Sequence, residues 1–181
     1  MCGNITNTIL ERRSIRAYKD KKVPKQMLEQ LLEYGFSAPS ARNLQPWHVT
    51  VIENPDTIDA LNKGVVNVLS QNPEMKERVS APDFNTFHKA PQLLLISADK
   101  SNNWAKIDCG MLTQNLLLAA HDMGLGTCVI GFVMTYLSAP EGKAMVDQLV
   151  PEGYEPLYAI TLGFPTEHPP ARPREMKVSW M

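Results

Sequence analysis

The chain of 181 residues has few cysteines, almost no net charge and no long apolar run. Cys2, Cys109 and Cys128 lie far apart and form no C-x-x-C pair or Cys/His set, so no metal or iron–sulfur site of known spacing is indicated. A net charge of −1 argues against nucleic acid as the main partner. With no secretory signal and no run long enough to span a membrane, we expect a soluble, cytoplasmic protein with no membrane partner.

A basic cluster stands out against this neutral background. Arg12, Arg13, Ser14 and Arg16 follow an apolar-periodic stretch, and a second basic pair, Arg172 and Arg174, lies near the other end of the chain. A guanidinium can donate two parallel hydrogen bonds to a phosphate. The two clusters therefore indicate one local anionic ligand, and the alternative is that they are solvated surface charges.

The spacing of apolar residues predicts a mixed fold in one domain, residues 1–181. Helical periodicity predicts helices over residues 4–13, 24–36, 56–70, 104–123 and 138–149. Short β-branched or apolar runs predict strands at 47–52, 93–97, 127–132 and 157–162. Asn4 is a possible helix cap, and the proline-rich tail from Gly163 should run extended. Because helices and strands are interspersed, we expect an α/β or α+β fold with helices on both faces of a central sheet.

Four motifs then occur in a distinctive order. They are Arg12-Arg13-Ser14-Ile15-Arg16; Ala38-Pro39-Ser40-Ala41-Arg42-Asn43-Leu44-Gln45-Pro46-Trp47; Asp108-Cys109-Gly110 with Gly124-Leu125-Gly126-Thr127-Cys128; and Leu162-Gly163-Phe164-Pro165 with Arg172-Pro173-Arg174. In this order the chain resembles the FMN-dependent nitroreductase family over nearly its whole length. The resemblance implies an α+β sandwich, with a mostly antiparallel sheet flanked by helices, in an intertwined homodimer that holds FMN at its interface.

The resemblance also implies a ping-pong reaction. NAD(P)H passes a hydride to FMN, and the reduced flavin then reduces a nitroaromatic, a quinone or a similar small-molecule acceptor. Two alternatives remain open: a specialised flavin reaction such as dehalogenation or enone reduction, and a non-catalytic protein that binds or stores FMN. No G-x-G-x-x-G motif follows a predicted strand, which leaves NADH, NADPH and a protein electron donor as possible reductants.

The FMN phosphate and the reduced ring each need positive charge. By resemblance, the phosphate contacts would come from Arg12, Ser14, Arg172 and Arg174, with Arg13 near the phosphate or the ribityl chain. Arg16 matches a basic residue near N1 and O2 of the ring, where a fixed cation stabilises the reduced flavin. The alternative for Arg16 is another phosphate contact or a surface ion pair.

The remaining expected contacts concern the ring. Pro39, Ser40, Ala41 and Asn43 match a loop that reaches the flavin from the partner chain, although these residue types also favour an ordinary turn. Asn67 is a candidate for an amide that bonds the pyrimidine edge. Ile130 and Gly131 match a segment that offers a backbone N–H to N5, with Ile130 standing where some relatives carry Glu. No general acid is assigned.

The roof of the substrate pocket departs from the family pattern. Many relatives have a helical insertion before the long helix, but here only residues 99–103 connect it to the preceding strand. We therefore expect residues 71–89 to cover the pocket, with Phe84 and Phe87 as gating aromatics. The alternative is that both phenylalanines pack in the core, where Cys109 and Cys128 are also expected.

Overall fold

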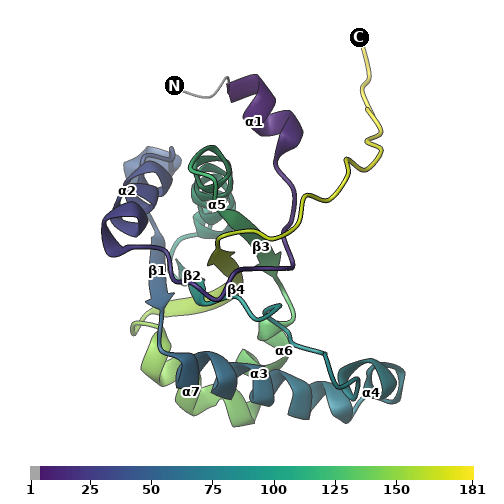
Figure 1. The fold of residues 1–181 in the computed structure, drawn as a ribbon. Helices are drawn as coiled ribbons and strands as arrows, with labels where there is room; N and C mark the ends of the chain where they lie inside the picture. The colour runs from purple at the N-terminus through teal and green to yellow at the C-terminus, as the bar shows by residue number, and fades with distance from the viewer. Residues whose placement is uncertain (1–4) are drawn as a thin grey trace.

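An antiparallel sheet of four strands, in the order β1-β2-β4-β3, separates two layers of helices in the computed structural model, which describes residues 5–181 (Figure 1). The strands are β1 (Trp47–Ile52), β2 (Gln92–Asp99), β3 (Gly126–Ile130) and β4 (Tyr154–Gly163). The helices are α1 (Ile5–Glu11), α2 (Lys25–Phe36), α3 (Pro55–Ser70), α4 (Pro73–Val79), α5 (Ala105–Asp122), α6 (Val133–Leu137) and α7 (Lys143–Leu149), with short 3₁₀ turns at Ala41–Asn43 and Pro140–Gly142. The expected α+β sandwich is confirmed.

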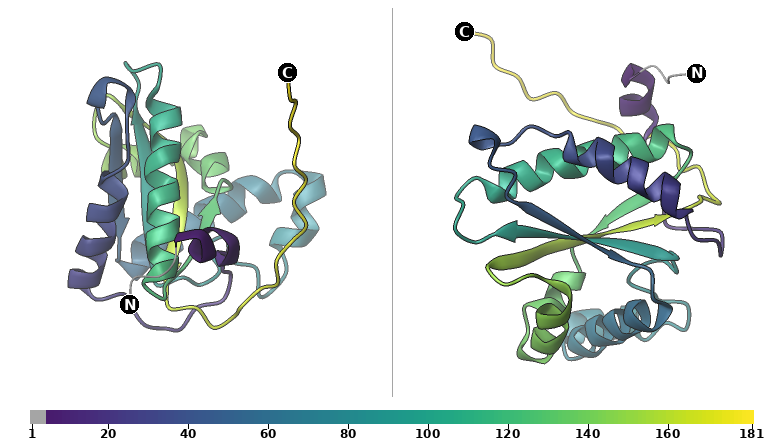
Figure 2. Two further views of the ribbon diagram at one scale, coloured as in Figure 1. Left: turned by 90° about the horizontal axis from the view of Figure 1, so that it is seen from above. Right: turned by 90° about the vertical axis from the view of Figure 1, so that its left-hand side faces the viewer.

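The two layers follow from the continuous apolar character of β2. Successive side chains of a strand point to opposite faces, so a strand buried on both faces needs no alternation. Leu94 and Ile96 pack in the cluster formed with α2 and α5, whereas Leu93 and Leu95 pack in the cluster formed with α3, α6 and α7. Figure 2 shows the sheet edge-on between these layers. None of the described helices combines the length and the apolarity that crossing a membrane requires.

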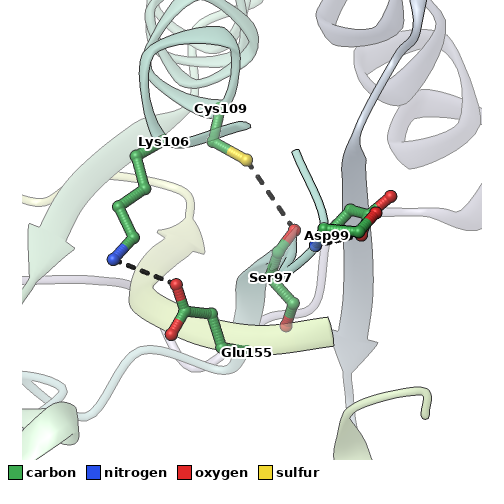
Figure 3. Close-up of polar contacts among 6 residues, drawn as sticks. Ser97, Asp99, Lys106, Cys109 and Glu155 are labelled. Carbon is green, nitrogen blue, oxygen red and sulfur yellow. Dashed lines mark hydrogen bonds and ion pairs between the residues drawn. The ribbon is translucent and has the colours of Figure 1, made fainter. Parts of the chain in front are cut away.

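The long helix α5 is fixed on the sheet by polar contacts as well as by apolar packing. Lys106 Nζ lies 3.0 Å from Glu155 Oε1 on β4, and the Cys109 thiol lies 3.7 Å from the Ser97 carbonyl oxygen on β2 (Figure 3). Burial raises the pKa of Cys109 to about 11. The thiol therefore stays protonated, and Cys109 is the core residue that the sequence predicts.

Three predicted boundaries are wrong in ways that matter for the site. The helix predicted over 138–149 begins only at Lys143, because the chain turns tightly before it; a Cβ at Gly142 would lie 2.0 Å from the Tyr136 carbonyl oxygen. The strand predicted over 127–132 ends at Ile130, so Gly131 and Phe132 leave the sheet. The first helix ends at Glu11, which frees Arg12 and Arg13 from it, and the proposed cap Asn4 lies outside the described residues.

Candidate functional site

The basic segment 12–16 runs alongside β3. Ser14 forms a parallel bridge with Thr127, and the Ile15 N–H donates to the Thr127 carbonyl at 2.9 Å. The approach is close, since a Cβ at Gly126 would lie 2.9 Å from Ile15. In an extended segment alternate residues share a side. Ile15 is buried in the core, while Arg12, Ser14 and Arg16 all lie near the Cys128 thiol.

The C-terminal tail crosses this segment and brings its own charge to it (Figure 1). Tyr18 forms an antiparallel bridge with Pro165, and the backbone N–H of Arg16 donates to the Glu167 carboxylate. Burial lowers the pKa of Arg12, and the positive charges of Arg13 and Arg174 lower it further. Cations from the two ends of the chain therefore converge at Arg12. Arg172 is exposed on the same tail, and its role stays a prediction.

Arg13 is partly committed to the backbone. Its Nη1 donates to the Leu10 and Arg12 carbonyl oxygens, both at 2.7 Å, and so caps the end of α1. Its Nε is buried and has no partner. Among residues 5–181 no carboxylate forms an ion pair with Arg12, Arg13 or Arg174. A buried N–H without an acceptor beside mutually repelling guanidiniums fits an anion that carries more than one charge.

Two hollows flank the segment. A small one of about 170 Å³ lies against Arg12 and Arg13, between His121, Gly124 and Pro165. The other, which we call the β3 hollow, has a volume of about 430 Å³, in the range of small-molecule sites. The β3 hollow is lined by Arg16, Arg78, Phe84, Asn85, Thr86, His88, Cys128, Val129, Ile130, Gly131 and Phe132.

The β3 hollow unites three of the predicted ring contacts, Arg16, Ile130 and Gly131. A Cβ built at Gly131 would meet no atom within 4 Å. The backbone there is open to the hollow, so a flat ligand can approach its N–H closely. The arrangement suits a planar polar group with one edge near a guanidinium.

Asn67 is not among the lining residues. It lies on the exposed side of α3, and the hollow is lined instead by Asn85 and Thr86. The Asn85 side-chain oxygen accepts from the Phe87 and Lys89 N–H groups, both at 3.0 Å, which leaves its NH₂ group available. Thr86 Oγ1 is buried and has no partner. Sequence reasoning missed both, although an Asn that closes its own turn is a recognised signal.

Of the two phenylalanines predicted to gate the pocket, Phe84 lines the β3 hollow and Phe87 does not. Phe87 is fully buried in the core, so the hypothesis that it gates the pocket is wrong. Cys128 is buried, as the sequence predicts, and it also lines the β3 hollow, which the sequence does not predict. Burial raises the pKa of Cys128 despite Arg16, Ser14 and Arg12, which act in the opposite direction.

The loop of Pro39, Ser40, Ala41 and Asn43 lies away from the arginines. The Ala41 N–H donates to the Asp108 carboxylate at 3.2 Å, near the start of α5, whereas Arg12 and Arg13 share a hollow with His121 at its end. Asp108 and His121 are 13 residues apart on α5, so about 20 Å of helix separates them. The loop of one chain therefore lies away from that chain's own arginine cluster.

Comparison with known proteins places these features in a family context. The model of the nitroreductase family matches residues 9–164. A protein from Methanothermobacter thermautotrophicus, named for NADH dehydrogenase/NAD(P)H nitroreductase activity, is 30% identical over 174 residues, which cover 93% of this chain and 81% of that one. A Bacteroides fragilis nitroreductase with bound FMN superposes with a TM-score of 0.85 at 28% identity, covering 99% of this chain and 97% of that one. An iodotyrosine deiodinase from Thermotoga neapolitana is 27% identical over 181 residues, covering 91% and 90%.

Proposed function

Because the chain belongs to the nitroreductase family, we propose that it is an oxidoreductase of one domain that binds FMN and reduces small-molecule acceptors with NAD(P)H. When bound, FMN would supply hydride transfer from NAD(P)H and electron transfer to a nitroaromatic, a quinone or a similar acceptor in a ping-pong cycle. The observation that carries this proposal is the convergence of Arg12 and Arg174 beside the unpartnered Nε of Arg13.

The phosphate of FMN satisfies what this cluster lacks. Arg12, Arg13 and Arg174 supply charge, and the Ser14 hydroxyl lies beside the Cys128 thiol, which Arg12 also approaches. A phosphate dianion relieves the repulsion between the guanidiniums and gives the buried Arg13 N–H an acceptor. Arg172 is the remaining residue of the tail that we assign to this anion.

The ring is assigned to the β3 hollow. Arg16 stabilises negative charge on the pyrimidine side, and the backbone at Ile130 and Gly131 faces the reactive edge. Thr86 and Asn85 take the role predicted for Asn67, since Thr86 has an unpartnered hydroxyl and Asn85 has a free NH₂ group. Each contact orients the ring without carrying a proton.

A second copy of the chain completes the site. The outer face of α5 exposes 53% of Ile107 and 48% of Met111, with 58% of Trp104 exposed just before the helix. If this face pairs with the same face of a second copy in antiparallel orientation, the start of one α5 lies beside the end of the other. The partner's copy of the loop 39–43 then lies near the arginine cluster, as an interfacial cofactor requires.

The test is anaerobic reduction of the purified, yellow protein. NADH or NADPH should bleach the flavin absorbance, and a nitroaromatic or quinone should restore it, with the released cofactor identified as FMN. Bleaching by neither nucleotide would refute NAD(P)H as the electron donor. If a nitroaromatic or quinone also failed to reoxidise the dithionite-reduced flavin, the result would refute the oxidoreductase assignment and favour a protein that binds or stores FMN.

A further inference from the structure

The β3 hollow has more positive charge than a flavin ring requires. Besides Arg16, its lining includes a second guanidinium, that of Arg78, and no Asp or Glu is among the described residues that line it. A neighbouring hollow of about 530 Å³ shares Arg16, Arg78, Phe84, Asn85 and His88, so the two adjoin. Arg78 therefore lines both of them.

Arg78 is held in place without being neutralised. Its guanidinium carbon lies 5.4 Å from the centre of the Phe132 ring, a cation–π contact that restrains the side chain and leaves its N–H groups free. Among residues 5–181 the Arg78 guanidinium forms no ion pair and no hydrogen bond. The nearest acidic lining residue is Asp83, which faces only the neighbouring hollow.

We propose that Arg78 and Phe132 form an anion-recognising acceptor subsite that favours aromatic acceptors carrying a carboxylate. This inference rests on the proposed function and names a substrate class for it. The planar guanidinium can donate two parallel hydrogen bonds to a carboxylate, and Phe84 and Phe132 provide apolar surface for the ring that carries it. Arg16 stays with the cofactor, so Arg78 is the cation left for the acceptor.

The test compares para-nitrobenzoate with para-nitrobenzamide, which have nearly the same shape and differ in charge. Because the amide also withdraws more electron density from the nitro group, the readout is the change in the ratio of kcat/KM for the anion to that for the amide. In the wild-type holoenzyme this ratio should fall as salt is added. Arg78→Gln should lower this ratio about tenfold, since a charge-assisted pair is lost. Arg78→Lys should lower this ratio less, because lysine keeps the positive charge but lacks the planar guanidinium that donates two parallel hydrogen bonds.

A matched control removes the same charge from the same helix. Lys76 is exposed on α4 and lines neither hollow, so Lys76→Gln should leave the ratio unchanged. A second readout needs no turnover: isothermal titration calorimetry should show benzoate binding the oxidised holoenzyme more tightly than benzamide, with that preference lost in Arg78→Gln.

The contrary outcomes are distinct. Equal effects of Arg78→Gln and Lys76→Gln, or no preference for benzoate in the wild type, would overturn the subsite. A change confined to the KM for NADPH would also overturn it, because the recognised anion would then be the phosphate of the electron donor. If no acceptor is reduced at all, the proposed function fails, while benzoate binding still decides whether the subsite exists.

Discussion

Arg174 makes a single-residue prediction about both stability and binding. In the FMN-free protein it adds positive charge beside Arg12, whose pKa it lowers, so Arg174→Ala should leave the melting temperature unchanged or raised. In the presence of FMN the same change removes a phosphate partner. FMN should bind tenfold to a hundredfold more weakly, because a charge-assisted hydrogen bond is worth about 1.5–3 kcal/mol.

Thermal unfolding of both forms, with FMN titration, measures the two effects. Lys177→Ala is the control, since Lys177 lies on the same exposed tail and pairs with Glu175 at 3.3 Å. A lower melting temperature of the FMN-free Arg174→Ala protein would show that Arg174 supports the fold and does not repel its neighbours.

His48 and His88 predict a dependence of stability on pH. Burial lowers the pKa of both; at His88, Arg16 and Arg78 act in the same direction and Glu167 opposes them. The unfolded chain then binds more protons, so the free energy of unfolding should fall as pH falls below the ordinary histidine value of about 6.5. Denaturant unfolding across this range should show a weaker fall in His48→Gln and in His88→Gln than in the wild type. Equal slopes in all three proteins would contradict this assignment.

At the scale of the element, α5 links the loop to the fold through Asp108. This carboxylate is buried and accepts from the Ala41 N–H at 3.2 and 3.3 Å. Asp108→Asn keeps the shape and removes the charge, which should cost about 1 kcal/mol of unfolding free energy. It should also weaken FMN binding, because the loop is expected to contact the flavin of the second copy. Chemical denaturation and FMN titration measure these effects.

Asp122→Asn is the control, because Asp122 is exposed at the other end of the same helix. If Asp108→Asn destabilises the fold but leaves FMN affinity unaltered, the loop has no part in the cofactor site.

The elements with strong apolar patterns could be predicted from sequence, and those set by tight turns could not. The α5 helix was predicted within one residue at each end, and β1 was predicted with its observed bounds, because apolar burial dictates both. The break before α7 depends on Gly142 packing against the Tyr136 carbonyl, a contact that periodicity does not encode.

Some residues of the candidate site also depend on tertiary contacts that the sequence pattern does not encode. The sequence grouped Arg12 with Arg174 through charge and resemblance, but it did not predict Asn85, Thr86 or Arg78. Asn85 and Thr86 lie just before a turn in which His88 and Lys89, neither of them glycine, both have φ of 55°, and Arg78 lies on α4. Such a turn carries no glycine signal, so its approach to β3 emerges only from the fold.

At the scale of the whole molecule, a shared site predicts that two defective chains can rescue each other. Arg12→Ala damages the arginine cluster, and Ser40→Trp damages the loop at the other end of α5. Each homodimer should bind FMN poorly. When the two proteins are mixed and allowed to exchange chains, each mixed dimer should gain one intact site, measured as recovered FMN absorbance. No recovery in mixtures shown to contain mixed dimers would place both sets of residues in a site within one chain.

Native mass spectrometry of the purified protein tests the central claim most directly. The claim is that the cations from both ends of each chain hold one FMN at the interface of two copies, so that a dimer has two FMN sites. The account predicts a species of twice the 20.2 kDa chain mass that carries two FMN molecules. A monomer that takes up no FMN when the nucleotide is supplied would contradict it.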